Sequence, residues 1–412
     1  MVPSRLITMV SGRADGKGSA SMPDPLCVAL ISGPMYDQLY ACIANFERAA
    51  GTRVNIGFRA PHEQLNAHLA SLPEVTYDLV STHTKYAPSQ LSFLAPLDDH
   101  ISQLNIADFY APLMERARIE GRLYGLPRNI DVKLLHYRKD LMAQAPGTWT
   151  ELIQTARRLS TGRGSFGFVF TGRGSGLFGM FFELAEMAGA RLFPESKIPQ
   201  LNNAGGAWAL EVIRELYSSG AVPAQVVEWR YDEAHQCFRD GRAAMICDWP
   251  GYYGAYHDPA VSQVSGQLGL ARMPAGPGGI HKAYAGSHTF ALTRRGIERP
   301  EAIQLLRFLT SPEQQLQEAR QGSVPARPAI VEQMRSEAPA AESERWRLLD
   351  CVIAEDALVP PSLPYYPAIE ELLWVTVRSA MTGEMGIPAA LDAMEKGIAE
   401  CHESHEAQIG TR

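Results

Sequence analysis

The chain has 412 residues, roughly three times the common size of one domain, which predicts two or three compact units. Hydrophobic residues make up 46% of it and charged residues 20%, a composition that excludes a disordered chain, a fibre and a coiled coil. With 38 Lys and Arg against 45 Asp and Glu, the net charge of −7 argues against a nucleic-acid partner.

Residues 1–24 are rich in Gly, Ser and Arg and contain one short apolar patch at 6–10. The apolar core of a secretion signal needs about 7–15 residues, so this patch does not make a convincing signal peptide. We expect residues 1–24 to form a flexible leader. No stretch of the chain approaches the roughly 18 consecutive apolar residues that span a bilayer.

Beyond Pro25, short apolar runs alternate with segments of helical spacing. Such alternation is typical of an α/β fold, in which parallel strands carry helices on both faces of the sheet. The expected strands cover 26–31, 54–58 and 77–81, and the expected helices between them cover 36–50 and 62–72.

Two loops follow the carboxyl ends of predicted strands, at 32–36 and 81–84. Ligands of open α/β sheets bind beyond these ends, so Tyr36 and His83 are candidate ligand contacts. By position alone, His83 is equally well explained as a solvated loop histidine.

The centre of the chain contains an expected strand over 130–137 and a helix that opens with a capping box, Thr148 and Glu151. A strand is expected at 166–170, followed by a glycine-rich loop at 171–176. That loop lacks the Gly-Lys-Ser/Thr ending of a nucleotide-binding loop, but the helix that it opens can receive an anion or a hydroxyl group at its N-terminus.

The second half of the chain alternates again before it ends in helices, and its six cysteines share no C-x-x-C spacing, as expected of small buried residues. No metal-ligand motif and no nucleophile paired with a base is present along the sequence. Strands are expected at 242–247 and 267–271, and helices at 204–218, 232–238, 301–309, 312–320, 342–353, 367–381 and 387–401.

Five sequence pieces, in order along the chain, resemble the sugar-type extracellular solute-binding proteins of ABC importers, the maltose-binding-protein-like group. Each piece is weak alone, and their shared order carries the resemblance. They are GRLYGLP at 121–127 with LLHYRKDL at 134–141, PGTWTEL at 146–152, FRDGRAAM at 238–245, MPAGPGG at 273–279, and FLTSPE at 308–313 with GSVPAR at 322–327.

This resemblance implies an α/β fold of the periplasmic-binding-protein type, with two lobes joined by hinge crossings. It places 25–131 plus 284–330 in an N-terminal lobe and 132–283 plus 331–412 in a C-terminal lobe. It also implies a monomeric, periplasmic or extracellular binder rather than an enzyme, without a cofactor, whose partner is a membrane permease pair with its ATPase. The implied ligand is a sugar, oligosaccharide, polyol or sugar acid.

Matching positions then predict the ligand contacts. Asp131 stands where the family often places a carboxylate at the hinge, and Trp249 where it supplies a stacking ring, with Tyr252 as the alternative ring. Trp249 in the core and Arg327 in a structural ion pair are the competing interpretations. The predicted binding residues are Tyr36, His83, Arg128, Asn129, Asp131, Arg173, Trp249, Tyr252, Gly286, Ser287, His288 and Arg327.

Other classes of function remain open at this point. Arg128, Arg173 and Arg327 suit an anionic ligand as well as a neutral one. A cytosolic two-lobed α/β enzyme that acts on a small polar or anionic substrate is the alternative to the binder. A regulator or chemoreceptor partner that retains the binding fold is the third.

Overall fold

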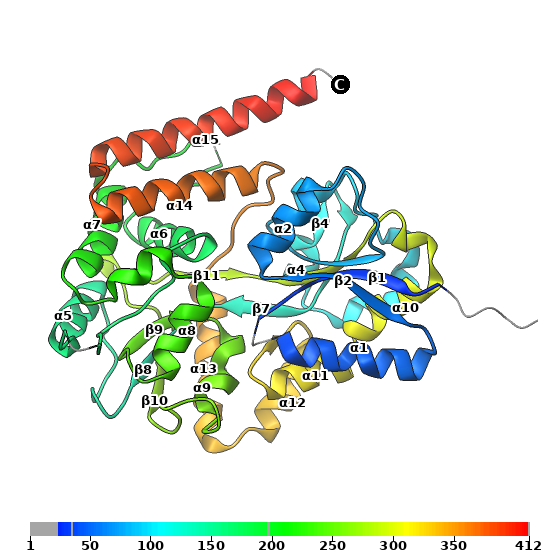
Figure 1. The fold of residues 1–412 in the computed structure, drawn as a ribbon, viewed down its shortest axis with the longest axis horizontal. Coiled ribbons are helices and arrows are strands. Elements are labelled where there is room, and N and C mark those ends of the chain that lie inside the picture. The colour runs from blue at the N-terminus through cyan, green and yellow to red at the C-terminus, as the bar shows by residue number, and fades with distance from the viewer. Residues whose placement is uncertain (1–23, 34–35, 163, 196–197, 411–412) are drawn as a thin grey trace, which may run out of the picture.

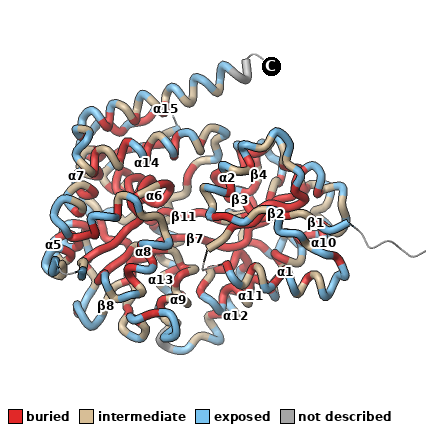
Figure 2. The backbone as a smooth tube through the Cα atoms, viewed as in Figure 1, coloured by how far each residue is buried: buried red, intermediate tan, exposed pale blue. Residues whose placement is uncertain are grey.

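The computed structural model describes residues 24–410, apart from 34–35, 163 and 196–197, so nearly all of the predicted leader lies outside the described residues. Two α/β lobes stand side by side and are joined by crossing strands (Figure 1). Each lobe has its own hydrophobic core, and the buried segments in Figure 2 follow the strands of both lobes. The predicted two-lobed α/β fold is confirmed.

The N lobe, as we use the term, is built around a five-stranded sheet of order β2–β1–β3–β12–β6. Strand β1 pairs in parallel with β2 and β3, as the alternating sequence predicts. Strand β12 returns from far along the chain and pairs antiparallel to β3, with His288 opposite His83. The strands are β1 (Leu26–Ile31), β2 (Val54–Ala60), β3 (Leu79–His83), β6 (Leu126–Pro127) and β12 (His288–Leu292).

Helices cover this sheet because their apolar residues recur at helical spacing. Helix α1, for example, buries Leu39, Cys42, Ile43 and Phe46 and ends at Gly51 with a left-handed φ of 67°. The N-lobe elements also include α1 (Asp37–Ala50), α2 (His62–Ser71), α3 (Ile101–Leu104), α4 (Ala111–Arg116), α10 (Pro300–Leu309), α11 (Pro312–Arg320), and the hairpin of β4 (Arg118–Ile119) and β5 (Arg122–Leu123). Helix α12 (Pro328–Glu337) packs against α11, but its buried residues Ile330, Val331 and Met334 belong to the core of the other lobe.

The C lobe is built around a three-stranded antiparallel sheet of order β10–β8–β9. Its strands are β8 (Leu134–Arg138), β9 (Met245–Asp248) and β10 (Leu268–Ala271). Its helices are α5 (Trp149–Leu159), α6 (Ser175–Met187), α7 (Ala204–Ser218), α8 (Tyr231–Arg239), α9 (Tyr253–His257), α13 (Ala340–Glu355), α14 (Tyr366–Thr382) and α15 (Ile387–Gly410).

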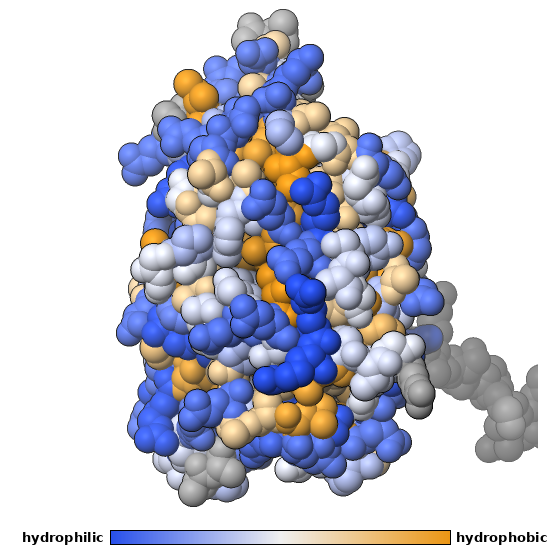
Figure 3. Space-filling model, turned by 90° about the vertical axis from the view of Figure 1, so that its left-hand side faces the viewer, coloured by the Kyte–Doolittle hydropathy of each residue, from blue (hydrophilic) through white to orange (hydrophobic). Residues whose placement is uncertain are grey.

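Helix α6 is buried on nearly all sides, because α7 and α14 pack against it. Over the outer face of this lobe, hydrophobic residues form small patches among hydrophilic ones (Figure 3). Within the described residues, each helix is too short or too polar to cross a membrane.

The two lobes are connected through β7 (Asn129–Val132) and β11 (Ala283–Gly286), which run antiparallel to each other. Short strands flank them, β13 (Val324–Pro325) beside β7 and β14 (Ala357–Leu358) beside β11. The predicted lobe boundaries at residues 131 and 284 therefore lie inside these crossing strands.

Three local expectations need correction. The strand predicted over 130–137 is interrupted at Lys133, whose backbone N–H donates to the carbonyl of Tyr284, so one half belongs to the crossing and the other to the C lobe. Residues 166–170 make only isolated bridges, at Phe166 and Val169, because their amides bond to several separate segments. Helix α12 was not expected; Pro328 suits its first turn.

Candidate ligand-binding site

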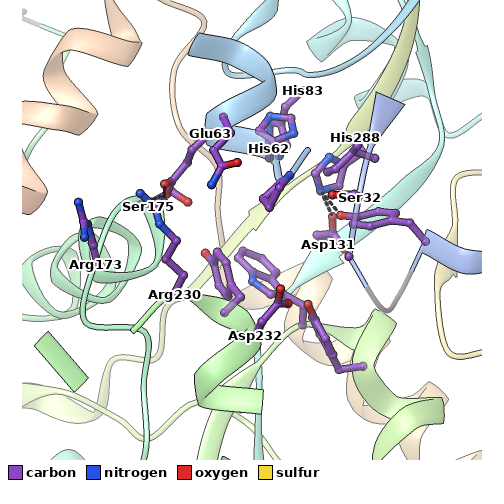
Figure 4. A pocket seen from close by; sticks show the side chains of 18 of the residues that line it. Ser32, His62, Glu63, His83, Asp131, Arg173, Ser175, Arg230, Asp232 and His288 are labelled. Atoms are coloured by element: carbon purple, nitrogen blue, oxygen red, sulfur yellow. Dashed lines mark hydrogen bonds and ion pairs between the residues drawn. The ribbon is translucent and has the colours of Figure 1, made fainter. Parts of the chain in front are cut away.

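A cavity of about 270 Å³ lies between the lobes, and both lobes line it together with the crossing strands. Figure 4 shows side chains from α2, β3, β7 and β12 facing those from the start of α6 and of α8. The walls therefore come from chain segments that are far apart in the sequence.

Asp131 lies on β7 at the hinge end of the cavity. The Asn129 side-chain amide donates to one carboxylate oxygen at 2.9 Å, and Nε2 of His288 lies 3.3 Å from the other. Burial raises the pKa of Asp131 to about 7, although the Asn129 hydrogen bond and the charge of Arg128 act to lower it. Near neutral pH the carboxyl group is therefore poised to accept or to donate a hydrogen bond.

Three histidine rings, His62 on α2, His83 on β3 and His288 on β12, meet at the N-lobe wall. Their ring centroids lie 4.9 to 5.5 Å apart. Both ring nitrogens of His62 and Nδ1 of His288 are buried without a hydrogen-bond partner among the described residues. These polar atoms are available to a ligand.

Burial lowers the pKa of all three histidines, that of His288 to about 3 with Arg128 and Lys85 adding to the effect. At neutral pH each ring is thus uncharged and offers one donor and one acceptor. Despite their proximity, no group of three or more His, Cys, Asp or Glu in the described part of the chain is arranged to hold a metal ion.

Aromatic rings form the opposite, C-lobe wall. Trp249 and Tyr252 follow β9, and Tyr231 opens α8. The indole of Trp249 packs against Tyr284 with ring centroids 5.7 Å apart, and Nζ of Lys133 lies 5.3 Å from its ring. Flat apolar faces of this kind suit the C–H face of a sugar or polyol.

The basic side chains of the cavity wall are already paired with carboxylates. Lys85 Nζ lies 2.6 Å from Glu370, and Arg173 lies 3.3 Å from Glu228. Arg230 pairs with Glu63. The same Glu63 carboxylate accepts a hydrogen bond from the backbone N–H of Ser175, so it occupies the helix N-terminus that the sequence marked as an anion position. A negatively charged ligand would compete with these carboxylates for the cations, although Nε of Arg173 has no partner among the described residues.

Residues 41–344 match the family model of the bacterial extracellular solute-binding proteins, which is well over half of the chain. The protein belongs to this family. A probable ABC transporter-binding protein of Deinococcus radiodurans is 28% identical over 242 residues, and the match spans 56% of this chain and 57% of that relative.

Solved structures of this type share the fold of the chain. Maltose-bound MalE3 of T. maritima has a TM-score of 0.82 at 24% identity, covering 91% of this chain and 99% of that one. A solute-binding protein of Agrobacterium radiobacter in complex with ribitol has a TM-score of 0.79 at 21% identity, covering 91% and 98%.

The structure brings most of the predicted contacts of this solute-binding protein to one cavity. The predicted residues that line it come from both lobes and from β7, and they are Tyr36, His83, Asp131, Arg173, Trp249, Tyr252 and His288.

Two other predicted residues lie one layer behind the cavity wall. Arg128 is buried in a two-pronged ion pair with Glu318, and its guanidinium lies 4.7 Å from the ring centroid of Tyr36. Asn129 bonds to Asp131 and accepts a hydrogen bond from the backbone N–H of His288. Both therefore orient side chains that line the cavity.

The last three predicted residues lie elsewhere. Gly286 and Ser287 line a second, mainly apolar cavity of about 330 Å³. A side chain at Gly286 would also meet the His83 ring, since a Cβ there would lie 2.5 Å from a ring carbon. Arg327 is held in the N lobe: its guanidinium covers Phe109 and donates to the carbonyl of Thr310, because that segment is folded back onto α10.

Several lining residues were not predicted, among them His62, Glu63, Lys85, Arg230, Tyr231 and Tyr284. The sequence does contain a signal that His62 and Glu63 belong to the binding site. They open α2 directly after β2, at the same edge of the sheet that pointed to Tyr36 and His83. Tyr231 and Arg230 open a helix of the other lobe, and nothing local to them marks a binding site.

Proposed function

We propose that this protein is the solute-binding component of an ABC importer and captures a small uncharged sugar or polyol between its lobes. The observation that carries the proposal is the pairing of two unlike walls across one cavity, neutral histidines on one side and aromatic rings on the other. Closing the lobes on a ligand adds the contacts of the second wall to those of the first, a hinge transition.

The chemistry of each wall supports this ligand class. Uncharged imidazoles and the Asp131 carboxyl group exchange hydrogen bonds with hydroxyl groups, which both donate and accept. The Trp249 ring covers the apolar face of the same molecule. A volume of about 270 Å³ lies just below the usual range of ligand cavities, about 300–1,000 Å³, and favours one sugar ring or an open-chain polyol.

An uncharged ligand is favoured over a sugar acid because Lys85 and Arg230 are each paired with a carboxylate. Arg173 also pairs with Glu228, while its Nε is left without a partner among the described residues. Burying a ligand carboxylate without a free cation is costly. Ribitol, the ligand in the Agrobacterium radiobacter structure, is a reasonable first probe.

The remaining parts of the proposal concern the setting. We infer a periplasmic or extracellular location, a monomeric state, and a permease pair with its ATPase as partner. The extracellular family supports the location, and the Deinococcus relative, named as a probable ABC transporter-binding protein, supports the partner.

A thermal-shift screen with ribitol, maltose, D-glucose and D-ribonate tests the ligand class. A ligand at 100 times its dissociation constant adds about 2.7 kcal/mol to the free energy of unfolding. We expect stabilisation by an uncharged compound and none by D-ribonate. Chemical conversion of a stabilising compound by the purified protein would instead favour the enzyme alternative, and stabilisation by D-ribonate alone would overturn the preference for an uncharged ligand.

A further inference from the structure

Glu63 joins the two lobes at the rim of the cavity. It belongs to α2 of the N lobe, yet its carboxylate accepts hydrogen bonds from two C-lobe groups, the Ser175 backbone N–H and the Arg230 guanidinium. Its side chain is 24% exposed and that of Arg230 is 36% exposed, so the contact lies at the edge of the cavity rather than in its interior.

The C lobe is shaped to receive this carboxylate. Ser175 is the first residue of α6, a helix of 13 residues, so its N–H is one of the amides that lack a partner within the helix. Gly174 precedes it with φ at +63°, and a Cβ there would lie 2.2 Å from Oε1 of Glu63. The left-handed backbone favours glycine here, and a larger residue would force the Glu63 carboxylate to shift.

Arg230 is held in place for the same contact. It caps α8, and its backbone N–H donates to the Glu233 carboxylate at 2.9 Å. Helix amides and a guanidinium together favour a negative charge at this position. The negative charge at this position is the Glu63 carboxylate of the N lobe.

We propose that Glu63 is a latch between the lobes and a specificity-determining residue: its carboxylate fills the anion-binding position of the C lobe, holds the cleft closed and excludes negatively charged ligands. The second part rests on the proposed function, because it concerns which ligand the cleft accepts. The first part does not depend on any ligand.

The latch is tested on the protein alone by hydrogen–deuterium exchange at the start of α6. In Glu63→Ala the Ser175 amide loses its acceptor, and we expect its exchange to accelerate about tenfold, as for the loss of one charge-assisted hydrogen bond. Glu63→Gln keeps an acceptor oxygen but no charge, so we expect its Ser175 exchange rate to lie between those of wild type and Glu63→Ala. Glu74→Gln removes a carboxylate from an exposed position just beyond α2 and serves as the matched control.

Selectivity is tested by calorimetry with ribitol and D-ribonate, which differ by one carboxylate. In Glu63→Ala, the ratio of D-ribonate affinity to ribitol affinity is expected to rise about tenfold over wild type and over Glu74→Gln. An unchanged ratio would overturn the role in specificity. Equal Ser175 exchange in wild type and Glu63→Ala would overturn the latch. If the proposed ligand class fails, with neither compound bound by wild type, the exchange measurement still decides the latch.

Discussion

The two walls of the cavity differ in what they present to a ligand. The N-lobe wall carries His62, His83 and His288, three uncharged polar rings. Both nitrogens of His62 and Nδ1 of His288 are buried without a partner in the described structure, whereas Nδ1 of His83 accepts a hydrogen bond from the Lys85 backbone N–H. The C-lobe wall carries Trp249 and Tyr252, which offer flat apolar faces. Hydrogen bonds set direction and stacking sets contact area, so neither wall alone recognises a polyhydroxyl compound well. Under the proposed function, tight binding therefore draws on both walls.

The largest loss of free energy is expected behind the N-lobe wall, where Arg128 forms a buried ion pair with Glu318. Arg128→Met leaves a carboxylate buried without its partner and removes the cation beside Tyr36, so we expect the free energy of unfolding to fall by about 3–5 kcal/mol. Urea denaturation measures this loss. Arg157→Met, which breaks an exposed pair with Glu215, is the control and should cost less than about 1 kcal/mol. Similar losses in both variants would contradict the role of Arg128.

The next largest effect, a loss of ribitol affinity, is expected for a substitution in the C-lobe wall. Trp249→Ala removes the stacking ring, and ribitol affinity should fall about 100-fold, or about 2.7 kcal/mol, measured by calorimetry. Trp208→Ala changes a partly buried tryptophan on α7, which does not line the cavity, and should leave the affinity unchanged. A large loss of stability with unchanged affinity would assign Trp249 to the core instead.

The pH dependence of stability separates the histidines from Asp131. The pKa of His288 is lowered to about 3 when folded, against about 6.5 when unfolded, so its contribution is full above pH 6.5 and is lost as the pH falls. Between pH 7.5 and pH 5 this loss amounts to about 2 kcal/mol. The raised pKa of Asp131 acts oppositely, since its contribution is full below its unfolded value near 3.9 and is lost as the pH rises through about 7.

Urea denaturation at pH 7.5 and pH 5 checks this prediction. His288→Gln should lose about 2 kcal/mol less than wild type on acidification. His405→Gln, on the C-terminal helix α15, should follow the wild-type profile. Parallel profiles for wild type and His288→Gln would show that this ring is not held neutral by burial.

The smallest effect is expected at His62. His62→Phe keeps a ring on α2 but removes both unpartnered nitrogens, so ribitol affinity should fall about tenfold, or about 1.4 kcal/mol. His68→Phe, on the same helix but stacked on Phe58, is the control in the same calorimetric titration. Equal affinities for wild type and His62→Phe would show that the ligand does not reach this part of the wall.

Local patterns predicted the first elements of the N lobe well. Helix α1 and strands β1 to β3 form close to where the apolar spacing places them, because periodicity decides which face of an element is buried. The rule for strand ends found Tyr36 and His83, and the resemblance to the family led to Asp131, Trp249 and His288. These residues share the cavity in the structure.

The sequence by itself determined the α/β class, the order of the early elements and the chemical types available for binding. Only the tertiary structure decided which charges are free. Arg128 meets Glu318, Arg230 meets Glu63 and Lys85 meets Glu370, in each case across more than 160 positions of the chain. Ion pairs depend on distance in space, which periodicity and local motifs do not encode, so the ion pairs on which we base the proposal of an uncharged ligand emerge only from the folded molecule.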